Sequence, residues 1–286
     1  MAHVRNFMED LKSVLGECGF SFKKQWGQNF LTDTNLLRAI AQDAGVDENT
    51  TVLEIGAGAG ALTRALSERA KKVLAYEIDR SLEPVLARTL AGCENVEVVF
   101  QDFAKADVSE VEAELGPFVV AANLPYYVTT PIVMRFVEES KNCKGLTVMV
   151  QEEVAERFCA KEGTADYGAV TAAIARRGTC KITRRVPREM FTPRPNVDSA
   201  VVKIDFTSGG FEVASPRAYR ETVRCAFLSR RKTLENNLMS VFRLGREESK
   251  EILRTAGIAD GVRGETLSPK DFAGLSDLLF EKGIVK

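Results

Sequence analysis

Residues 51–69 read T-V-L-E-I-G-A-G-A-G-A-L-T-R-A-L-S-E-R, and the architecture can be worked out from this segment. Thr51–Ile55 is a short apolar run typical of a buried strand, and Ala61–Arg69 has the period of a helix. The glycines between them permit a tight turn and let a ligand approach the backbone, while the start of the helix offers free N–H groups. The segment therefore predicts a strand, a ligand-binding loop and a helix in succession.

The same alternation continues along the chain on both sides of this segment. Apolar runs at Thr51–Ile55, Lys72–Glu77, Val96–Phe100, Phe118–Ala122 and Leu146–Gln151 are followed by helical periods at Ala61–Arg69, Leu82–Leu90, Glu110–Leu115, Thr130–Glu138 and Glu152–Cys159. An amphipathic helix within residues 1–20 and a helical period at Asn35–Ala44 come first. This pattern predicts βαβ units and a mostly parallel, Rossmann-like sheet.

A change of pattern near residue 208 predicts a second domain. Two further strands, Cys180–Val186 and Ala200–Phe206, are expected to close the sheet antiparallel. A linker rich in Thr, Ser and Gly follows, and beyond it the period is helical throughout, with Ser268 and Pro269 placed to start the last helix. We therefore expect an α/β domain at residues 1–208 and a small all-helical domain at 209–286.

Composition and the scarce histidine exclude several classes of protein. The 286 residues are 45% hydrophobic and 28% charged, which is typical of a globular protein, and no apolar run approaches the ~18 residues of a membrane helix. The N-terminus carries acids, unlike a signal peptide, so we expect a soluble cytoplasmic protein. The six cysteines form no C-x-x-C pair and the only histidine is His3, so we expect scattered reduced thiols, no metal site and no histidine base.

A net charge of −1 hides a strongly basic stretch. Residues 176–232 hold 14 Lys+Arg and 5 Asp+Glu, a balance of +9, so the rest of the chain must carry −10. The basic residues are clustered, most densely at Arg230, Arg231 and Lys232. A basic stretch within a mildly acidic protein indicates contact with a polyanion, with a solvated helix face as the alternative.

Two cofactors fit the glycine loop. Glu77 ends the second strand, where an acid would bind the hydroxyls of a ribose. Gly56, Gly58 and Ala61 match the pattern for NAD, whereas Glu54, two residues before the first glycine, favours S-adenosylmethionine. Asp102 after the third strand would accept from an adenine amine, with Phe103 or Ile78 packed on the ring; the alternative for Asp102 is a helix N-cap.

The fourth strand ends in N-L-P-Y-Y, residues 123–127, beside the crevice in which α/β sheets bind ligands. The amide oxygen of Asn123 and the carbonyl of Leu124 would accept the two hydrogens of an adenine amine, directing its lone pair at a methyl donor. Pro125 would hold that carbonyl outward, and Tyr126 would stack on the base. Tyr127 is expected to pack under the loop rather than touch RNA.

These motifs together resemble the N6-adenine methyltransferases. Three more stretches resemble, more narrowly, the KsgA/RsmA family of small-subunit rRNA adenine dimethyltransferases: K-Q-W-G-Q-N-F-L at 24–31, F-T-P-R-P-N-V-D-S at 191–199 and F-L-S-R-R-K-T-L-E-N-N-L at 227–238. The likeness extends in order from about Gly19 to the C-terminus. It implies dimethylation of two adjacent adenines in a hairpin near the 3′ end of 16S rRNA, within an immature 30S subunit.

The resemblance also implies roles for individual residues. Gln28, Asn29 and Leu31 would close over S-adenosylmethionine, Gly56 and Gly58 would approach its amino-acid end, and Phe191 would cover the face of the target base opposite Tyr126. Phe191 reads equally as a core ring. Arg194, Arg230, Arg231 and Lys232 are candidates for RNA phosphates. Trp26 departs from the smaller or aliphatic residue expected before G-Q-N-F, which affects how the N-terminal segment packs.

Several alternatives remain at this stage. A large-subunit rRNA dimethyltransferase of the antibiotic-resistance type would share the core motifs, and a 30S assembly factor with secondary methylation is compatible with all of them. An NAD dehydrogenase would lack a proton donor near the crevice, and a C5-pyrimidine methylase would need a cysteine after a proline. A protein glutamine methylase would have proline in place of Leu124. We expect a monomer.

Overall fold

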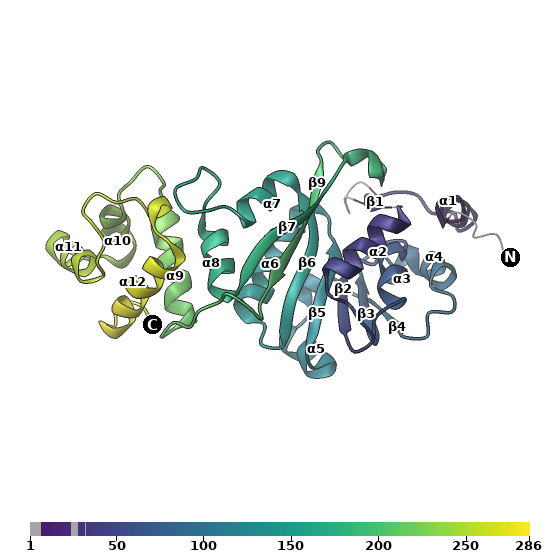
Figure 1. Cartoon of the computed structure of the whole chain (residues 1–286), viewed down its shortest axis with the longest axis horizontal. Coiled ribbons are helices and arrows are strands. Elements are labelled where there is room, and N and C mark those ends of the chain that lie inside the picture. Colours follow the sequence, from purple (N-terminus) through teal and green to yellow (C-terminus); the bar gives the residue numbers. More distant parts are fainter. Residues whose placement is uncertain (1–6, 24–27, 32) are drawn as a thin grey trace. The chain divides into compact units, whose positions relative to one another are not determined.

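The computed structural model describes residues 7–23, 28–31 and 33–286. Its centre is a seven-stranded sheet in the order β4-β3-β2-β5-β6-β9-β7 (Figure 1). Neighbours from β4 to β6 pair in parallel and β9 pairs antiparallel with β6, so the mostly parallel Rossmann-like sheet is confirmed. The strands are β2 (Thr51–Ile55), β3 (Lys72–Glu77), β4 (Val96–Phe100), β5 (Phe118–Asn123), β6 (Cys143–Gln151), β7 (Thr179–Val186) and β9 (Ser199–Asp205).

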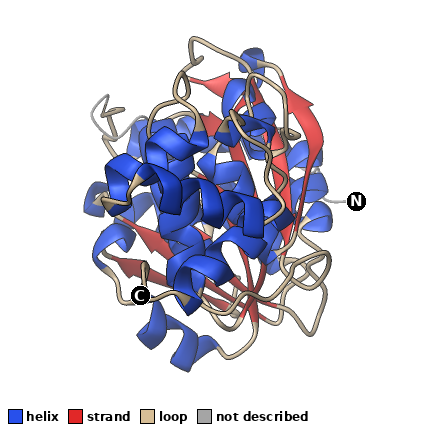
Figure 2. Cartoon of the chain, turned by 90° about the vertical axis from the view of Figure 1, so that its left-hand side faces the viewer, coloured by secondary structure: helices blue, strands red, loops and turns tan. Residues whose placement is uncertain are grey.

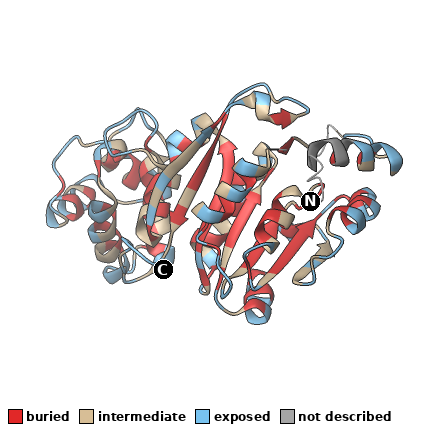
Figure 3. Ribbon diagram, turned by 45° about the vertical axis from the view of Figure 1, so that its right-hand side comes forward, coloured by how far each residue is buried: buried red, intermediate tan, exposed pale blue. Residues whose placement is uncertain are grey.

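Helices connect the parallel strands and cover the sheet. In chain order they are α1 (Phe7–Glu17), α2 (Thr34–Asp43), α3 (Ala61–Ser67), α4 (Glu83–Thr89), α5 (Val108–Leu115), α6 (Tyr126–Glu139) and α7 (Glu152–Phe158). α2 packs beside α3, and α5 beside α6. The central strands are almost wholly buried (Figure 3), as expected for parallel strands covered on both faces.

Two short strands were not expected from the sequence. β1 (Phe30–Leu31) and β8 (Phe191–Thr192) form a separate antiparallel pair in which Leu31 lies opposite Phe191. Two residues are too few to show a strand period, so no pattern could reveal this pair. It matters because it brings the N-terminal motif and F-T-P-R-P together.

The chain divides into two compact units. The first unit is the chain up to Ala155 together with Lys181–Asp205, and the second unit is Glu156–Cys180 together with Phe206–Lys286. The second domain was expected to begin at residue 209, whereas the C-terminal part of the second unit begins at Phe206. The sequence analysis did not predict that residues 156–180 belong to the second unit. This segment joins the second unit because Tyr167 is buried in the helical core and donates a hydrogen bond to the Leu267 carbonyl at 2.9 Å.

The second unit is helical apart from the first two residues of β7 (Figure 2). As expected, Ser268 caps the last helix: its hydroxyl accepts from the Asp271 N–H, with Pro269 at the first position. None of the helices in the described ranges is long and apolar enough to span a membrane. The helices are α8 (Ala169–Arg177), which the sequence did not predict, then α9 (Pro216–Phe227), α10 (Leu234–Phe242), α11 (Arg246–Thr255) and α12 (Pro269–Glu281).

Candidate active site

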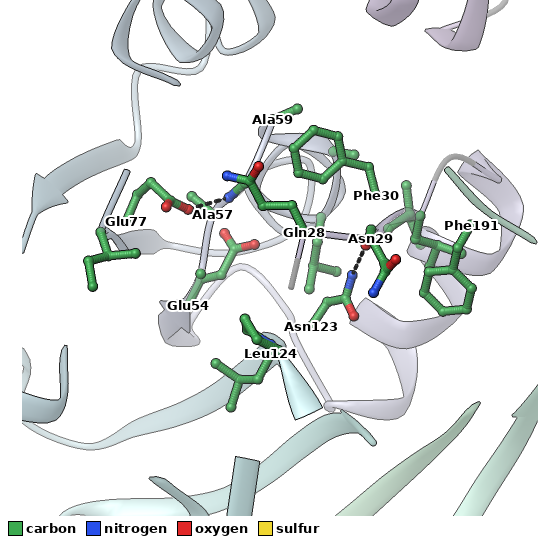
Figure 4. Close-up of a pocket in the computed structure, with 18 of the residues that line it drawn as sticks. Gln28, Asn29, Phe30, Glu54, Ala57, Ala59, Glu77, Asn123, Leu124 and Phe191 are labelled. Atoms are coloured by element: carbon green, nitrogen blue, oxygen red, sulfur yellow. Dashed lines mark hydrogen bonds between the residues drawn. The ribbon is translucent and has the colours of Figure 1, made fainter. Parts of the chain in front are cut away.

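A pocket in the first unit lies at the carboxyl ends of β2, β3 and β5 (Figure 4). The strand order reverses between β2 and β5, which is the position where open α/β sheets bind ligands. The pocket encloses about 830 Å³ of empty space, counting the solvent at its mouth. Its lining residues are Gln28, Asn29, Phe30, Leu31, Leu37, Glu54, Gly56, Ala57, Gly58, Ala59, Ala61, Leu62, Glu77, Ile78, Asn123, Leu124, Pro125, Tyr126 and Phe191.

The glycine loop between β2 and α3 requires glycine for two separate reasons. Gly58 has a φ of +56°, which side chains disfavour, and a Cβ built on it would lie 3.2 Å from the ring of Phe30. Its N–H donates to the Glu77 carboxylate at 2.7 Å. Gly56 also has a positive φ, of +81°. The loop is thus held against β3 on one side and against β1 on the other.

A chain of hydrogen bonds joins this loop to the N-terminal segment. Glu77 accepts from Gly58 N–H and, at 2.8 Å, from Asp79 N–H. Asp79 in turn accepts from the Gln28 side-chain amide at 3.0 Å and from the Lys23 ammonium at 2.6 Å. Burial would raise the pKa of Asp79, but the hydrogen bonds from Lys23, Ser81 and Gln28 outweigh it and lower that pKa. No motif in the sequence singled out Asp79 as a residue of the site.

Glu77 lies where the sequence placed it, at the end of β3 in the pocket wall. Its carboxylate is almost wholly buried, and burial raises its pKa. The two backbone N–H groups leave each oxygen with capacity for a second donor, because a carboxylate accepts about four hydrogen bonds. Binding of ribose hydroxyls by Glu77 remains a prediction that this geometry permits.

Glu54 is the unusual group of the pocket. Its side chain is 0% exposed. The Thr63 hydroxyl lies near its carboxyl group, but no well-formed hydrogen bond from a described residue reaches either oxygen. Burial, with a contribution from the Glu77 charge, outweighs the lowering of the pKa by Thr63 and raises that pKa to about 8. An unpartnered buried carboxyl group is costly unless a donor reaches it. The pocket therefore suits a ligand with a cationic end, such as the ammonium group of S-adenosylmethionine.

Asn123, Leu124 and Pro125 follow β5 directly into the pocket. The Asn123 amide nitrogen donates to the Asn29 carbonyl at 3.4 Å, and no described residue donates to its Oδ1 (Figure 4). The Leu124 carbonyl likewise accepts from no described residue, whereas the Pro125 carbonyl accepts from Val128 N–H at 3.1 Å. Two free acceptors, one amide and one carbonyl, therefore stand in the order that the sequence predicted.

Aromatic rings from two elements complete the pocket wall. Tyr126 begins α6, and its hydroxyl is 2.8 Å from the Ser199 hydroxyl, which fixes the ring. Phe191 reaches the pocket from β8. It is also a buried member of the core, which confirms the reading as a core residue, while its contact with a base stays a prediction. Leu31, opposite Phe191, lines the pocket as well.

Two of the predicted cofactor contacts lie outside this pocket. Asp102 is the N-cap of a short 3₁₀ helix (Phe103–Lys105) and accepts from Ala104 N–H at 3.0 Å, the alternative that the sequence left open. Phe103 is only 4% exposed and packs between Tyr76 and Phe136, so the packing of its ring on an adenine stays a prediction without support from the pocket. Ile78 is 40% exposed in the pocket wall and is the better candidate for packing on an adenine.

The prediction for Tyr127 was wrong. Its side chain is 61% exposed rather than packed under the loop. The sequence analysis started the helix at Thr130, but α6 begins at Tyr126, so Tyr127 stands in the first helical turn and faces solvent. The prediction about Trp26 concerns residues 24–27, which lie outside the described ranges.

Most of the clustered arginines are engaged by carboxylates. Arg184 forms a bidentate pair with Asp43 at 2.7 and 2.9 Å, and Arg194 pairs with Glu189. Arg230 pairs with Glu265 at 3.1 Å and donates to a backbone carbonyl, while Arg231 and Lys232 are exposed with no partner among the described residues. The charge free to meet a polyanion is therefore smaller than the sequence count, and within F-L-S-R-R-K it lies at Arg231 and Lys232. No group of three metal-binding side chains occurs in the described part of the chain.

Comparison with known proteins gives consistent matches over nearly the whole chain. Ribosomal RNA small subunit methyltransferase A of Geobacillus thermodenitrificans (strain NG80-2) is 46% identical over 276 residues, or 94% of each chain. The protein of the same name from Streptococcus thermophilus (strain CNRZ 1066) is 44% identical over 281 residues, covering 96% of this chain and 97% of that one.

Two solved structures with a similar fold are named as a dimethyladenosine transferase and an rRNA methyltransferase. A dimethyladenosine transferase from Plasmodium falciparum superposes with a TM-score of 0.73 at 25% identity, covering 90% of this chain and 99% of that one. The 23S rRNA methyltransferase ErmE gives a TM-score of 0.67 at 29% identity, covering 88% and 100%. A family model described as ribosomal RNA adenine dimethylase matches residues 19–280. The chain therefore belongs to the ribosomal RNA adenine dimethylase family.

Proposed function

We propose that this enzyme transfers methyl groups from S-adenosylmethionine to N6 of two adjacent adenines in the 3′-terminal hairpin of 16S rRNA, during assembly of the 30S subunit. The observation that carries this proposal is that Asn123–Tyr126 line the same pocket as the glycine loop. A methyl donor held by the loop and a base held by N-L-P-Y would then meet in one cavity. Relatives 44–46% identical are named as small-subunit rRNA methyltransferases, which supports the choice of 16S rRNA.

The cofactor would be held by the wall formed from β2, β3 and the N-terminal segment. When bound, S-adenosylmethionine supplies an electrophilic methyl group on a sulfonium centre. Glu77 would accept from the ribose and Ile78 would pack on the adenine. Gly56 and Gly58 allow close approach of the amino-acid end, whose ammonium group would satisfy Glu54. Gln28, Asn29 and Leu31 would cover this end of the pocket, while Asp102 and Phe103, outside the pocket, are the least supported of the predicted contacts.

The target adenine would be held by the two free acceptors that follow β5. An adenine amine is a poor nucleophile because its lone pair is delocalised into the ring. Asn123 Oδ1 and the Leu124 carbonyl would accept its two hydrogens and so direct the lone pair out of the ring plane. Tyr126 and Phe191 would hold the base by stacking, worth about 1–3 kcal/mol per ring. Catalysis then rests on positioning and electrostatics, and needs no histidine base.

Contact with the rest of the RNA is proposed at exposed cations of both units. Arg231 and Lys232 have no carboxylate partner among the described residues and are the strongest candidates. Arg194 and Arg230 would have to share their charge with Glu189 and Glu265. We further propose that the protein acts as a monomer in the cytoplasm on an immature 30S subunit.

Methylation of the large subunit is the nearest alternative. ErmE, a 23S rRNA methyltransferase, is 29% identical to this chain, well below the small-subunit relatives. A labelled methyl-transfer assay with unmethylated 30S and 50S particles decides between them. We expect N6,N6-dimethyladenosine near the 3′ end of 16S rRNA only, and label confined to 23S rRNA would refute the proposal.

The variant Asn123→Ala distinguishes a main role in 30S assembly from a main role in methyl transfer. We expect this variant to bind 30S precursors as the unmodified enzyme does while methyl transfer falls by at least about a hundredfold, as for the loss of a positioned polar group in a catalytic site. If instead the variant matures 30S particles normally in cells, methylation is the secondary activity.

A further inference from the structure

The six cysteines looked scattered in the sequence, but two of them meet in the second unit. The sulfur atoms of Cys159 and Cys180 are 3.1 Å apart, although 21 positions separate the residues in the chain. A disulfide bond is about 2.05 Å long, so a shift of about 1 Å would bring the sulfurs to bonding distance. Both residues are partly exposed.

The remaining cysteines offer a contrast. Cys143 and Cys225 are buried, and Cys93 is partly buried with its sulfur 3.3 Å from the Ser67 hydroxyl. Cys159 and Cys180 bring two sulfur atoms within hydrogen-bonding distance of each other. The distance between the two sulfur atoms therefore sets this pair apart from the other cysteines. The pair belongs to the second unit, so this observation does not depend on the pocket in the first unit.

We propose that Cys159 and Cys180 form a reversible disulfide bond when the protein meets a small-molecule disulfide. The reaction is thiol–disulfide exchange. The Cys159 thiolate attacks one sulfur of the small disulfide, which releases one small thiolate and leaves a mixed disulfide on Cys159. The sulfur of Cys180, losing its proton, then attacks Cys159 and releases the second small thiolate. Two protein thiols are oxidised and one small disulfide is reduced to two thiols.

The contact between the thiols assigns the order of the two steps. Their hydrogen bond lowers the pKa of Cys159 and raises the pKa of Cys180, which burial raises further. The thiolate is the nucleophile in exchange, so the thiol with the lower pKa attacks first. Cys180, adjacent to it, is then placed to resolve the mixed disulfide.

The bond would also fasten a segment of the second unit. It would close a loop that contains α8 and Tyr167, whose hydroxyl holds the segment to the Leu267 carbonyl. The same loop supplies the Ala165 carbonyl, which accepts from Arg230 at 2.8 Å. Since closing a loop constrains the unfolded chain, the oxidised protein should unfold at a higher temperature.

The test uses the full-length protein in buffers of increasing ratio of oxidised to reduced glutathione, quenched with acid and alkylated. Peptide mass mapping should find Cys159 joined to Cys180, with a mass lower by two hydrogen atoms, while Cys93 remains alkylated. Cys180→Ser should trap glutathione on Cys159, and Cys159→Ser should form no intramolecular bond. The matched control Cys93→Ser should leave the bond unchanged.

Two results would overturn the proposal. One is alkylation of both Cys159 and Cys180 at a ratio that already places glutathione on Cys93. The other is a disulfide that joins any different pair of cysteines. Peptide mapping of the unmodified protein decides the question even if a serine variant does not fold. A melting temperature that is unchanged on oxidation would refute the claim that the disulfide stabilises the segment between Cys159 and Cys180.

Discussion

At the scale of single residues, Glu54 shows how a ligand site can oppose the stability of the unliganded protein. Its carboxyl group is fully buried and accepts no well-formed hydrogen bond from a described residue, and its pKa is raised to about 8. An ordinary interior position would carry an apolar residue or supply donors. We interpret the missing partner as the place of a cationic ligand group, so the same residue should penalise the empty pocket and favour the filled one.

This interpretation predicts the pH dependence of Glu54→Gln. The pKa of Glu54 is raised in the folded state, so its contribution to the free energy of unfolding is present below about pH 4.5 and is lost as the pH rises to about 8. The loss is at most about 1.4 kcal/mol per pH unit. The empty Glu54→Gln protein should lack this decline and melt higher than the unmodified protein at pH 8, as measured by thermal denaturation. Its affinity for S-adenosylmethionine should fall.

A matched control separates this effect from the loss of a buried carboxylate in general. Glu112 is also buried, but it accepts hydrogen bonds from the backbone N–H groups of Lys141 and Asn142. Glu112→Gln should therefore destabilise the protein at neutral pH, because one oxygen acceptor is replaced by a donor. If Glu54→Gln also destabilises the empty protein at pH 8, Glu54 is a structural residue.

A second residue-scale prediction concerns Gly58. Gly58→Ala would meet both a positive φ and the Phe30 ring 3.2 Å away, whereas Gly92→Ala would meet a similar φ of +83° with nothing within 4 Å. Each should cost about 1 kcal/mol of unfolding free energy for the backbone. Only Gly58→Ala should in addition weaken binding of S-adenosylmethionine, measured by calorimetry. Equal cofactor affinity of the two variants would contradict the role of the Phe30 contact.

At the scale of elements, the start of α6 changes the assignment of the two tyrosines. Because the helix begins at Tyr126, the adjacent side chains diverge: the Tyr126 hydroxyl meets Ser199, while Tyr127 is exposed. The sequence analysis placed the start of this helix at Thr130. Proline is in fact the N-cap of α6, where its missing N–H costs nothing.

An exposed ring one residue beyond the pocket predicts a further contact with RNA. Tyr127→Ala should lower kcat/KM for 30S particles by about five- to a hundredfold, since a ring stacked on a base is worth about 1–3 kcal/mol. Its affinity for S-adenosylmethionine and its melting temperature should not change, because the side chain is exposed. Tyr126→Phe, which loses the Ser199 bond, provides the comparison within the pocket. Unchanged kcat/KM in Tyr127→Ala would show that the ring lies free of the RNA.

At the scale of the whole molecule, the sequence predicted the parallel sheet and its cofactor crevice because each depends on local pattern. Apolar strands, the glycine loop and Glu77 are all visible within one βαβ unit. Contacts between distant segments could not be predicted. Neither the β1–β8 pair nor the inclusion of 156–180 in the second unit leaves a periodic signal, and the hydrogen bond from Gln28 to Asp79 spans 51 positions. Sequence pattern also could not distinguish a core position from a ligand position at Phe103, which is buried in the structure.

Fewer cations are available to bind RNA in the structure than the count from the sequence suggests, and this difference supports the last prediction. Arg230 pairs with Glu265, whereas the neighbouring Arg231 and Lys232 have no partner in the described part of the chain. The double variant Arg231→Ala/Lys232→Ala should bind 30S particles more weakly and flatten the log–log dependence of affinity on salt by about one to two units, since each phosphate contact contributes roughly 0.7–0.9. Its melting temperature should stay unchanged.

Arg230→Ala should do the reverse, lowering the melting temperature through the loss of Glu265 and Ala165 contacts while changing the salt slope little. Filter binding between 50 and 200 mM salt measures the slope, because the Debye length roughly halves over this range. If Arg230→Ala changes the slope as much per removed charge as the double variant does, the basic cluster acts as one diffuse charge rather than through its two free cations.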